Sequence, residues 1–457
     1  MKKLTFLLLA VSSSLATIHA QSGIINTIAG DGIAGFAGDG TSATNSKLDT
    51  IQFIAVDDSD NVYIADAQNN RIRKVYKQTG IIATIAGTGT PGYTGDYGLA
   101  VNAAIDYPVA IAIGPGGDVY FTDGGNGVVR KITKSTGVIN TFAGTGIFGN
   151  SGDDSAATNC RFEAPTGIAV DNLGNVYIAD ADTGNSRVRV VDAANGNIYA
   201  FAGTGRHGFS GDGAAATAAQ LNQPLGISLD NSGNLYIADW ENAVVRKVTI
   251  SSGIISTVAG IHGVFTPELT NGTATSVPIS YPTDVACDVN GNVYISDVGT
   301  GVIRELTPSN GNETMLAGNG LPGFDGDGGQ ALNAELNYPF AVALDGASNI
   351  FIGDLLNFRI REVNAYVSTV PEISASGNFS VYPNPVSNIL NIAFSATYNS
   401  AQSTLEIMDI TGRAIINSPL SIVNSNASVD VSTLSAGMYF IKISNTASSE
   451  VVKFIKE

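Results

Sequence analysis

Short apolar runs follow one another along most of the chain and are separated by turns rich in Gly, Asn and Asp. In one representative group the runs occupy Pro165–Val170, Asn175–Ala179, Arg187–Val191 and Asn197–Gly203. Runs this short, bounded by turn residues, are typical of β-strands rather than helices. The pattern therefore predicts four strands in each group.

The group of four strands recurs six times. Its second strand contains an aromatic residue and ends on Asp, and the intervals between successive Asp residues are 57, 57, 59, 58 and 57 positions. A period this regular indicates one supersecondary unit copied in tandem, and four antiparallel strands per unit predict an all-β, six-bladed β-propeller. A solenoid is the alternative architecture. The six residues are Asp66, Asp123, Asp180, Asp239, Asp297 and Asp354.

The two ends of the repeat array favour a closed ring. The run Gly23–Gly30 copies a fourth strand, Gly80–Gly87, whereas the sixth unit passes into Asn364–Pro371 without such a copy. We expect the N-terminal run to complete the last blade and remove its open edge, although Tyr366–Val370 could compete for that place. A small residue at the centre of every first strand fits the crowded axis of a propeller. These small residues are Ala55, Ala112, Ala169, Ser228, Ala286 and Ala343.

The repeat unit resembles a known family. Residues 174–180, Gly-Asn-Val-Tyr-Ile-Ala-Asp, followed by Arg187-Val188-Arg189, look like an NHL repeat of a six-bladed propeller. The resemblance extends over roughly residues 23–365 and recurs in all six units. It implies a scaffold, because relatives with this repeat bind proteins, RNA or glycans, and a few are lyases or lactonases.

Residues 1–20 resemble a secretory signal peptide. Lys2 and Lys3 precede the apolar run Leu4–Val11, and a polar segment ends at Ala20. A first helix of the fold is the alternative. We assign residues 21–370 to the propeller and the Pro/Ser/Gly-containing residues 371–378 to a linker. No later apolar run reaches the length of about 18 residues that a membrane span requires, so no membrane span is predicted.

Residues 379–457 lack the blade pattern and alternate in short strands, which predicts a small β-sandwich. Four markers, at 381–385, 405–413, 434–443 and 453–456, resemble in order and spacing the C-terminal sorting domain of type IX secretion, found in Bacteroidota. The resemblance implies that the type IX secretion machinery carries the chain across the outer membrane, so that it is secreted or held at the cell surface. A carbohydrate-binding or adhesive sandwich is the alternative.

Charge and cysteine content exclude several classes of protein. The formal net charge is −17, which disfavours nucleic acid and anionic membrane surfaces as partners, because neither offers counter-charge to an acidic protein. Two Cys residues are too few for a disulfide framework or a thiolate metal cage.

Each unit also places an Arg after its Asp. The interval is seven residues in five units and nine in the third. We expect each Asp to satisfy turn amides and to pair with its own Arg across the hairpin. A ring of six carboxylates holding a cation or ligand is the alternative. The predicted pairs are Asp66/Arg73, Asp123/Arg130, Asp180/Arg189, Asp239/Arg246, Asp297/Arg304 and Asp354/Arg361.

Long Asp-Gly loops connect the fourth strand of most units to the next unit, and the fifth unit replaces this motif with Gly263–Thr275. Loops on a rigid frame commonly carry recognition, so we expect this face to bind an extracellular protein or glycan. Calcium is possible here, although no loop has the carboxylate density of an EF-hand; no other cofactor is predicted. The candidate ligand-binding carboxylates are Asp39, Asp96, Asp153, Asp212, Asp325 and Asp327.

The central channel carries the enzymatic alternative. Related lactonases hold a metal at the channel mouth with Glu, Asn and Asp, whereas the polar residues at those positions here are Gln52, Thr166, Thr283 and Asp284. Only Asp284 is a carboxylate, and His207 and His262 are too few for a zinc site of three His ligands. A binding scaffold is therefore favoured over a channel-centred metal-dependent hydrolase or lyase, with a surface-layer structural part as the third possibility.

Overall fold

The computed structural model describes residues 23–182, 184–364, 379–382, 386–394, 403–409, 413–420, 422, 426–435, 437–444 and 449–456. The chain divides into two compact units, Met1–Tyr366 and Val367–Glu457, and each is described here by itself. The predicted signal peptide (1–20) and linker (371–378) lie outside the described residues. No helix among the described residues is long and apolar enough to cross a membrane.

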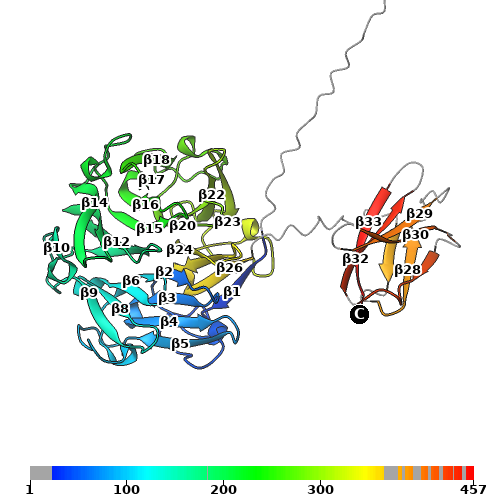
Figure 1. Cartoon of the computed structure of the whole chain (residues 1–457), viewed down its shortest axis with the longest axis horizontal. Helices are drawn as coiled ribbons and strands as arrows, with labels where there is room; N and C mark the ends of the chain where they lie inside the picture. The colour runs from blue at the N-terminus through cyan, green and yellow to red at the C-terminus, as the bar shows by residue number, and fades with distance from the viewer. Residues whose placement is uncertain are drawn as a thin grey trace, which may run out of the picture. The chain divides into compact units, whose positions relative to one another are not determined.

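The first unit consists of antiparallel sheets arranged around a common centre, as Figure 1 shows. Its described residues form six sheets, which we call blades 1 to 6 in chain order. Blades 1 to 3 are β2–β5 (Ile51–Val56, Val62–Asp66, Arg71–Tyr76, Ile81–Ala86), β6–β9 (Pro108–Ile113, Val119–Asp123, Val128–Ile132, Ile139–Ala143) and β10–β14 (Ser155–Ala156, Pro165–Val170, Val176–Asp182, Asn185–Val191, Asn197–Gly205). Blades 4 to 6 are β15–β18 (Pro224–Leu229, Leu235–Asp239, Val244–Thr249, Ile254–Gly260), β19–β23 (Gly272–Thr273, Pro282–Cys287, Val293–Asp297, Val302–Thr307, Asn312–Ala317) and β24–β26 (Pro339–Leu344, Ile350–Asp354, Arg359–Val363) with β1 (Ile25–Ala29).

The N-terminal strand closes the ring. Strand β1 pairs antiparallel with β26, with Ile25 opposite Val363 and Thr27 opposite Arg361. The innermost strands β2, β6, β11, β15, β20 and β24 each contact the next, and β24 contacts β2. This confirms the predicted completion of the last blade by the N-terminal run; Tyr366–Val370, the predicted competitor, lies outside the described residues.

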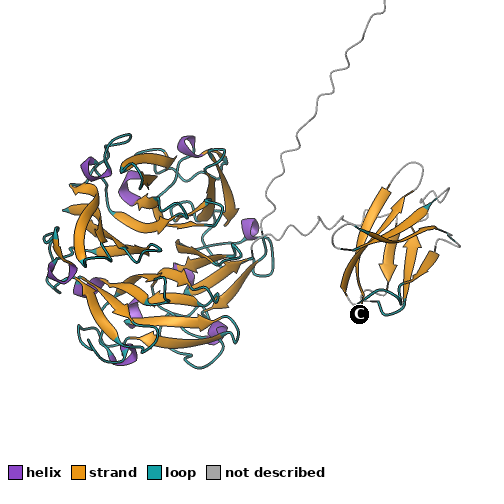
Figure 2. Ribbon diagram, viewed as in Figure 1, coloured by secondary structure: helices purple, strands orange, loops and turns teal. Residues whose placement is uncertain are grey.

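Short 3-10 helices occupy the connections and turns (purple in Figure 2). Among the described residues they are Ala43–Asn45, Ala67–Asn69, Ala100–Asn102, Gly124–Asn126, Ala157–Asn159, Ala216–Ala218, Trp240–Asn242, Ala274–Ser276, Ala331–Asn333 and Leu355–Asn357.

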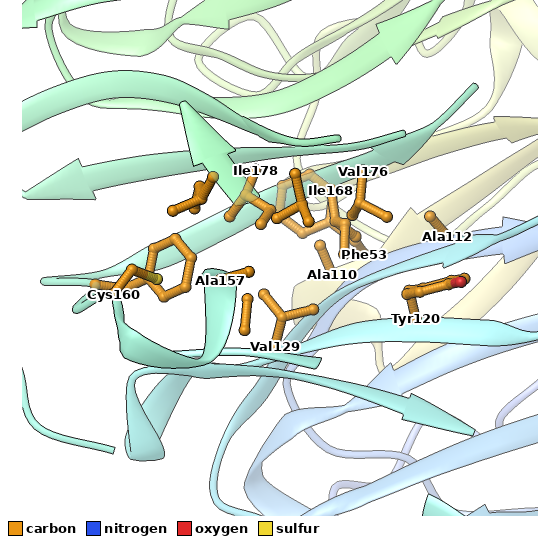
Figure 3. Packing of buried hydrophobic residues seen from close by; sticks show 14 residues of the cluster. Phe53, Ala110, Ala112, Tyr120, Val129, Ala157, Cys160, Ile168, Val176 and Ile178 are labelled. Atoms are coloured by element: carbon orange, nitrogen blue, oxygen red, sulfur yellow. The ribbon is translucent and has the colours of Figure 1, made fainter. Parts of the chain in front are cut away.

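The hydrophobic core of the propeller lies between neighbouring blades. Between blades 2 and 3, Ala110 and Val129 pack with Ile168 and Ile178, and Cys160 joins them from the connecting loop (Figure 3). Equivalent clusters fill the other blade interfaces. Both faces of each sheet are thus buried, which explains why the strands are nearly continuous apolar runs.

The second unit is a small β-sandwich. One sheet has the order β27-β28-β31 and the other β30-β29-β32-β33. Both sheets contribute to a single core, which includes Phe379, Leu390, Ile407, Ile441 and Phe454. The strands are Phe379–Tyr382, Ile389–Phe394, Thr404–Met408, Ala414–Pro419, Asn426–Asp430, Gly437–Ser444 and Ser449–Lys456 (β27 to β33).

Candidate functional site

Because the strands of each blade are antiparallel, two kinds of connecting segment lie on the same face of the propeller. The connections from the outer strand of one blade to the inner strand of the next, such as residues 87–107, lie on the same face as the turns between second and third strands, such as Ala67–Asn69. We call this the loop face. The turns between first and second strands lie on the opposite face.

A buried Arg bridges two carboxylates in each of blades 1, 2, 4 and 6. In blade 1, Arg73 lies 3.2 Å from the buried Asp66 and 2.7 Å from Asp39 of the preceding loop. It also donates to the carbonyl oxygen of Ala37 in that loop. The Arg therefore fastens the long loop to the blade. Equivalent Arg residues lie between Asp123 and Asp96 (Arg130), Asp239 and Asp212 (Arg246), and Asp354 and Asp327 (Arg361).

An Asn three residues after the buried Asp completes this network. In blade 1 the Asn69 side-chain amide donates to Asp66 and to the Gly35 carbonyl oxygen of the loop, at 2.8 and 2.7 Å. Asn126, Asn242 and Asn357 do the same in blades 2, 4 and 6. The buried Asp also accepts the backbone N–H of the residue that leads to the inner strand, as Asp66 does from Asp49. Each network thus positions both the loop and the segment at the channel mouth.

An aromatic ring covers each of these Arg residues on the loop side. The guanidinium carbons of Arg73 and Arg246 lie 4.8 and 4.9 Å from the ring centroids of Phe36 and Phe209. Tyr93 and Phe324 cover Arg130 and Arg361 in the same way. These contacts are within the range of cation–π attraction.

Blade 3 departs from the predicted pairing, and the Asp180/Arg189 pair is not formed. Arg189 instead lies 2.6 Å from Asp153, which also binds Arg187 at 2.7 Å. Asp180 accepts hydrogen bonds from the Asn185 side chain and from backbone amides. The cause is the longer hairpin in this blade, which places Asn185 beside Asp180.

Blade 5 lacks the Asp-Gly loop and compensates from within its own sheet. Arg304 lies 2.7 Å from Asp297 and 3.0 Å from Glu313 of the outer strand β23. It also donates to the carbonyl oxygens of Glu268 and Thr270 in the divergent loop. The Arg of blade 5 therefore has two carboxylate partners, as in blades 1, 2, 4 and 6, although its second carboxylate comes from the outer strand rather than from the loop.

Burial dominates the protonation chemistry of these networks. It raises the pKa of Asp66, Asp123, Asp239 and Asp354 to about 6, against the opposing effect of the Arg and amide hydrogen bonds. Burial likewise raises the pKa of Glu313 to about 7.

The loop carboxylates are mostly engaged inside the protein. Of the six candidates, Asp39, Asp96, Asp153, Asp212 and Asp327 each form an ion pair with an Arg of their blade. Asp325 is exposed and accepts the N–H of Gly326. Among the described residues, no group of three or more His, Cys, Asp or Glu side chains is placed to hold a metal ion.

The four predicted channel-mouth residues connect neighbouring blades. Gln52 donates to the Tyr107 hydroxyl of blade 2, and Thr166 donates to the Pro224 carbonyl oxygen of blade 4, both at 3.1 Å. Thr283 donates to the Phe340 carbonyl oxygen at 2.7 Å. The Asp284 carboxylate accepts the backbone N–H groups of Val285 and Val342. These side chains therefore join inner strands around the ring.

A cavity of about 370 Å³ lies along the channel between the inner strands. Its lining is largely aliphatic and includes five of the six small residues predicted for the axis, all except Ala55. Asp284 and Cys287 are its ionisable groups. Burial holds the pKa of the Asp284 carboxyl well above its usual value and raises that of the Cys287 thiol to about 12. Cys160 and Cys287 are free thiols.

Aromatic residues gather where the inner strands begin. Tyr281 lies beside Trp240 of the blade 4 turn and Phe265 of the divergent loop, with ring centroids 5.8 and 4.7 Å apart. Tyr338 stacks on Phe340, and its pKa is raised by burial and by the Tyr281 hydroxyl. We define Tyr107, Trp240, Phe265, Tyr281 and Tyr338 as the aromatic rim.

Neither the aromatic rim nor the Asn of the blade networks was predicted from the sequence. A signal for the rim is present: Tyr directly precedes the Pro of the inner strand at 107–108, 281–282 and 338–339. A signal for the Asn is its fixed place three residues after Asp66, Asp123, Asp239 and Asp354. Both patterns become informative once the topology shows which segments meet.

Protein family models match a part of the first unit and nearly all of the described second unit. Residues 380–457 match the secretion system C-terminal sorting domain, residues 162–199 match the NHL repeat, and residues 197–268 match the teneurin NHL domain.

Curated relatives share the propeller region. The protein SUPPRESSOR OF QUENCHING 1 of Arabidopsis thaliana is 26% identical over 321 residues, which cover 68% of this chain and 30% of the relative. Teneurin-1 of Mus musculus is 25% identical over 342 residues, which cover 68% of this chain and 10% of teneurin-1. NHL repeat-containing protein 2 of Bos taurus is 25% identical over 338 residues, which cover 68% of this chain and 46% of that protein. The matched region thus spans less than half the length of each of these relatives.

Solved structures share the fold. A protein of unknown function from Bacteroides thetaiotaomicron superposes with a TM-score of 0.57 at 18% identity, covering 75% of this chain and 76% of that one. An auxiliary nutrient binding protein from Bacteroides ovatus gives 0.53 at 17% identity with the same coverage.

The sorting domain marks the chain for export by type IX secretion to the cell surface or the medium. Sequence match, repeat and topology agree on both units. The chain combines an NHL-repeat β-propeller with a secretion-system C-terminal sorting domain.

Proposed function

We propose that this protein is an exported binding scaffold whose propeller recognises an extracellular protein or glycan through the loop face. Residues 21–370 form the binding domain, and residues 379–457 engage the type IX secretion machinery. The observation that carries the proposal is the fastening of each long loop by a buried Arg. Such loops are held on a rigid frame and can present the same surface without an ordering cost on binding.

The exposed composition of these loops supports recognition. Ile33, Ile147 and Leu321 are each more than half exposed on the loop face, and Phe36 and Phe324, from the connections that carry Ile33 and Leu321, are exposed as well. These side chains offer apolar surface for contact with a partner. The fold neighbours include a nutrient-binding protein, which is consistent with a binding role for this architecture.

The binding test uses the full exported chain on arrays of purified extracellular proteins and glycans. A triple variant, Ile33→Ser, Ile147→Ser and Leu321→Ser, should lose the binding signal. A matched control, Leu173→Ser with Val289→Ser, changes exposed residues in turns of the opposite face and should retain it. Equal loss in both variants, or no binding by the parent chain, would refute the proposal.

Delivery is tested separately by deleting Phe379–Glu457. The truncated chain should remain in the cell envelope, whereas the full chain reaches the surface or medium. Normal appearance of the truncated chain outside the cell would contradict the assigned role of this segment.

A further inference from the structure

Three rim tyrosines have an unfavourable backbone conformation. Tyr107, Tyr281 and Tyr338 have φ of 48°, 60° and 61°, and each precedes a Pro. A left-handed φ in a bulky residue costs about 1–3 kcal/mol, whereas Gly adopts it readily. A following Pro restricts the residue further. Thr50 and Gln223 hold the same conformation in blades 1 and 4, with φ of 51° and 53°, so the strain belongs to the position and Tyr is one of several residues that accept it.

These side chains present aromatic surface to solvent. Tyr281 and Tyr338 are 36% and 38% exposed. The ring plane of Tyr281 is inclined by 32° to Phe265 and by 53° to Trp240, so the rings form a stepped surface rather than a closed cage. The buried Trp240 indole N–H has no acceptor among the described residues.

The connection that leads into blade 5 differs in sequence from the others and contributes an aromatic residue to the rim. Its divergent loop, Gly263–Thr275, replaces the Asp-Gly motif and brings Phe265 against Tyr281. Ser280 donates to the Phe265 carbonyl oxygen at 2.8 Å and fixes the loop there. The only inter-blade connection without the motif therefore supplies an aromatic ring to the mouth.

The segments that lead into the inner strands disfavour an anionic ligand. The segments that lead into the six inner strands, 49–53, 106–110, 163–167, 222–226, 280–284 and 337–341, contain no Lys or Arg. They contain Asp49, Asp106, Glu163 and Asp284. A phosphate, sulfate or uronate would meet carboxylates without a compensating cation.

We propose that the aromatic rim binds an uncharged oligosaccharide, whose sugar rings stack on Tyr281 and Tyr338 while its hydroxyl groups bond the tyrosine hydroxyls. This inference rests on the proposed binding function and names its ligand class and site. A sugar ring offers an apolar C–H face and a rim of hydroxyl groups, which matches flat rings with polar tips. The absence of a cage disfavours a cationic ligand, which is best held between converging ring faces.

The test is isothermal calorimetry of the full exported chain with neutral gluco-, manno-, xylo- and galacto-hexasaccharides. At least one should bind, and Tyr281→Ala and Tyr338→Ala should each weaken it at least about tenfold. Tyr281→Phe, which keeps the ring, should weaken it less than Tyr281→Ala. Tyr338→Gly, which suits the backbone, repeats the test if Tyr338→Ala fails to fold.

Tyr97→Ala is the matched control. Tyr97 also has a left-handed φ, of 67°, and is 87% exposed, but its backbone N–H bonds to Ile139 of the outer strand β9. This variant should bind like the parent chain.

Three results would overturn the inference: no binding by any hexasaccharide at about 10 mM, binding unaffected by the rim variants, or preference for polygalacturonate or deca-lysine. A protein ligand that depends on the loop-face residues, without saccharide binding, would leave the proposed function standing and remove only this inference. If neither saccharide binding nor loop-face binding is found, both this inference and the proposed function are refuted.

Discussion

The buried Arg networks and the aromatic rim lie on the same face of the propeller but differ in how often they recur. An Arg with two carboxylate partners occurs in five of the six blades, and the exception, blade 3, retains an Arg paired with a loop carboxylate. The rim tyrosines occur in three blades only, and its Trp and Phe in one blade each.

This difference indicates that the Arg networks stabilise the fold, whereas the aromatic rim serves recognition. An interaction that stabilises one blade is needed in every blade, because the blades share one structure. A single ligand contacts only some of the blades, so its binding residues need not recur. The Asp side chains that the sequence places on the loop face mainly bind Arg. Of the rim residues, Tyr281 and Tyr338 are exposed at the channel mouth.

The largest expected effect follows from removing one Arg. Arg246→Met leaves the buried Asp239 and the loop Asp212 without their cation, so the free energy of unfolding should fall by about 3–5 kcal/mol in urea titration. Arg413→Met removes an Arg that is mostly exposed in its pair with Asp409, and should cost less than about 1 kcal/mol. Equal costs for the two variants would contradict the structural role of the network.

Asp284 should give the propeller a pH-dependent stability. Its folded-state pKa is raised by burial, so the folded chain holds the proton after the unfolded chain has released it. The stability contribution therefore falls as pH rises above about 4. Asp284→Asn should make this slope shallower in unfolding experiments, while the other buried carboxylates with raised pKa values, such as Asp66 and Glu313, keep their share of it. Thr283→Val, which changes no ionisable group, should leave the slope unchanged. Parallel slopes for Asp284→Asn and the parent chain would refute this account.

The hydrogen bonds between blades at the mouth should have a smaller effect. Thr283→Val keeps the side-chain shape but removes the bond to the Phe340 carbonyl oxygen, which should cost about 1 kcal/mol in thermal or urea unfolding. A loss of unfolding free energy as large as that of Arg246→Met would show that the hydrogen bonds at the mouth stabilise the propeller as much as the Arg networks do.

The smallest expected effect is an increase in the free energy of unfolding. Gln223 precedes an inner strand with φ of 53°, so Gln223→Gly should stabilise the chain by up to about 1 kcal/mol. Ala164→Gly changes the equivalent residue of blade 3, which has no positive φ, and should destabilise by about 0.5–1 kcal/mol. Destabilisation by both substitutions would show that the mouth residues are not strained.

Strand pattern and repeat length predict the blades well, because buried strands are strongly specified by their apolar residues. The third unit shows this, since its four predicted runs correspond to β11 to β14 with small shifts at the ends. The closing strand was also predictable, because Gly23–Gly30 copies a fourth strand that the last unit lacks.

The pairing of loop Asp with blade Arg was harder to predict. Asp39 and Arg73 lie 34 residues apart, and the same separation recurs for Asp96/Arg130, Asp212/Arg246 and Asp327/Arg361. Spacing alone does not show that a long loop folds back onto its own next blade. The rim was missed because its Tyr-Pro pairs at 107–108, 281–282 and 338–339 lie far apart in the sequence, and only the topology brings them to one channel mouth.

Trp240 is the single tryptophan of the chain and lies in the aromatic rim, so its fluorescence reports directly on the channel mouth. Titration with the bound hexasaccharide should change the Trp240 emission with the same Kd as calorimetry, and Tyr281→Ala should weaken binding in both measurements. Calorimetric binding that leaves the Trp240 emission unchanged would place the ligand elsewhere and contradict the central claim.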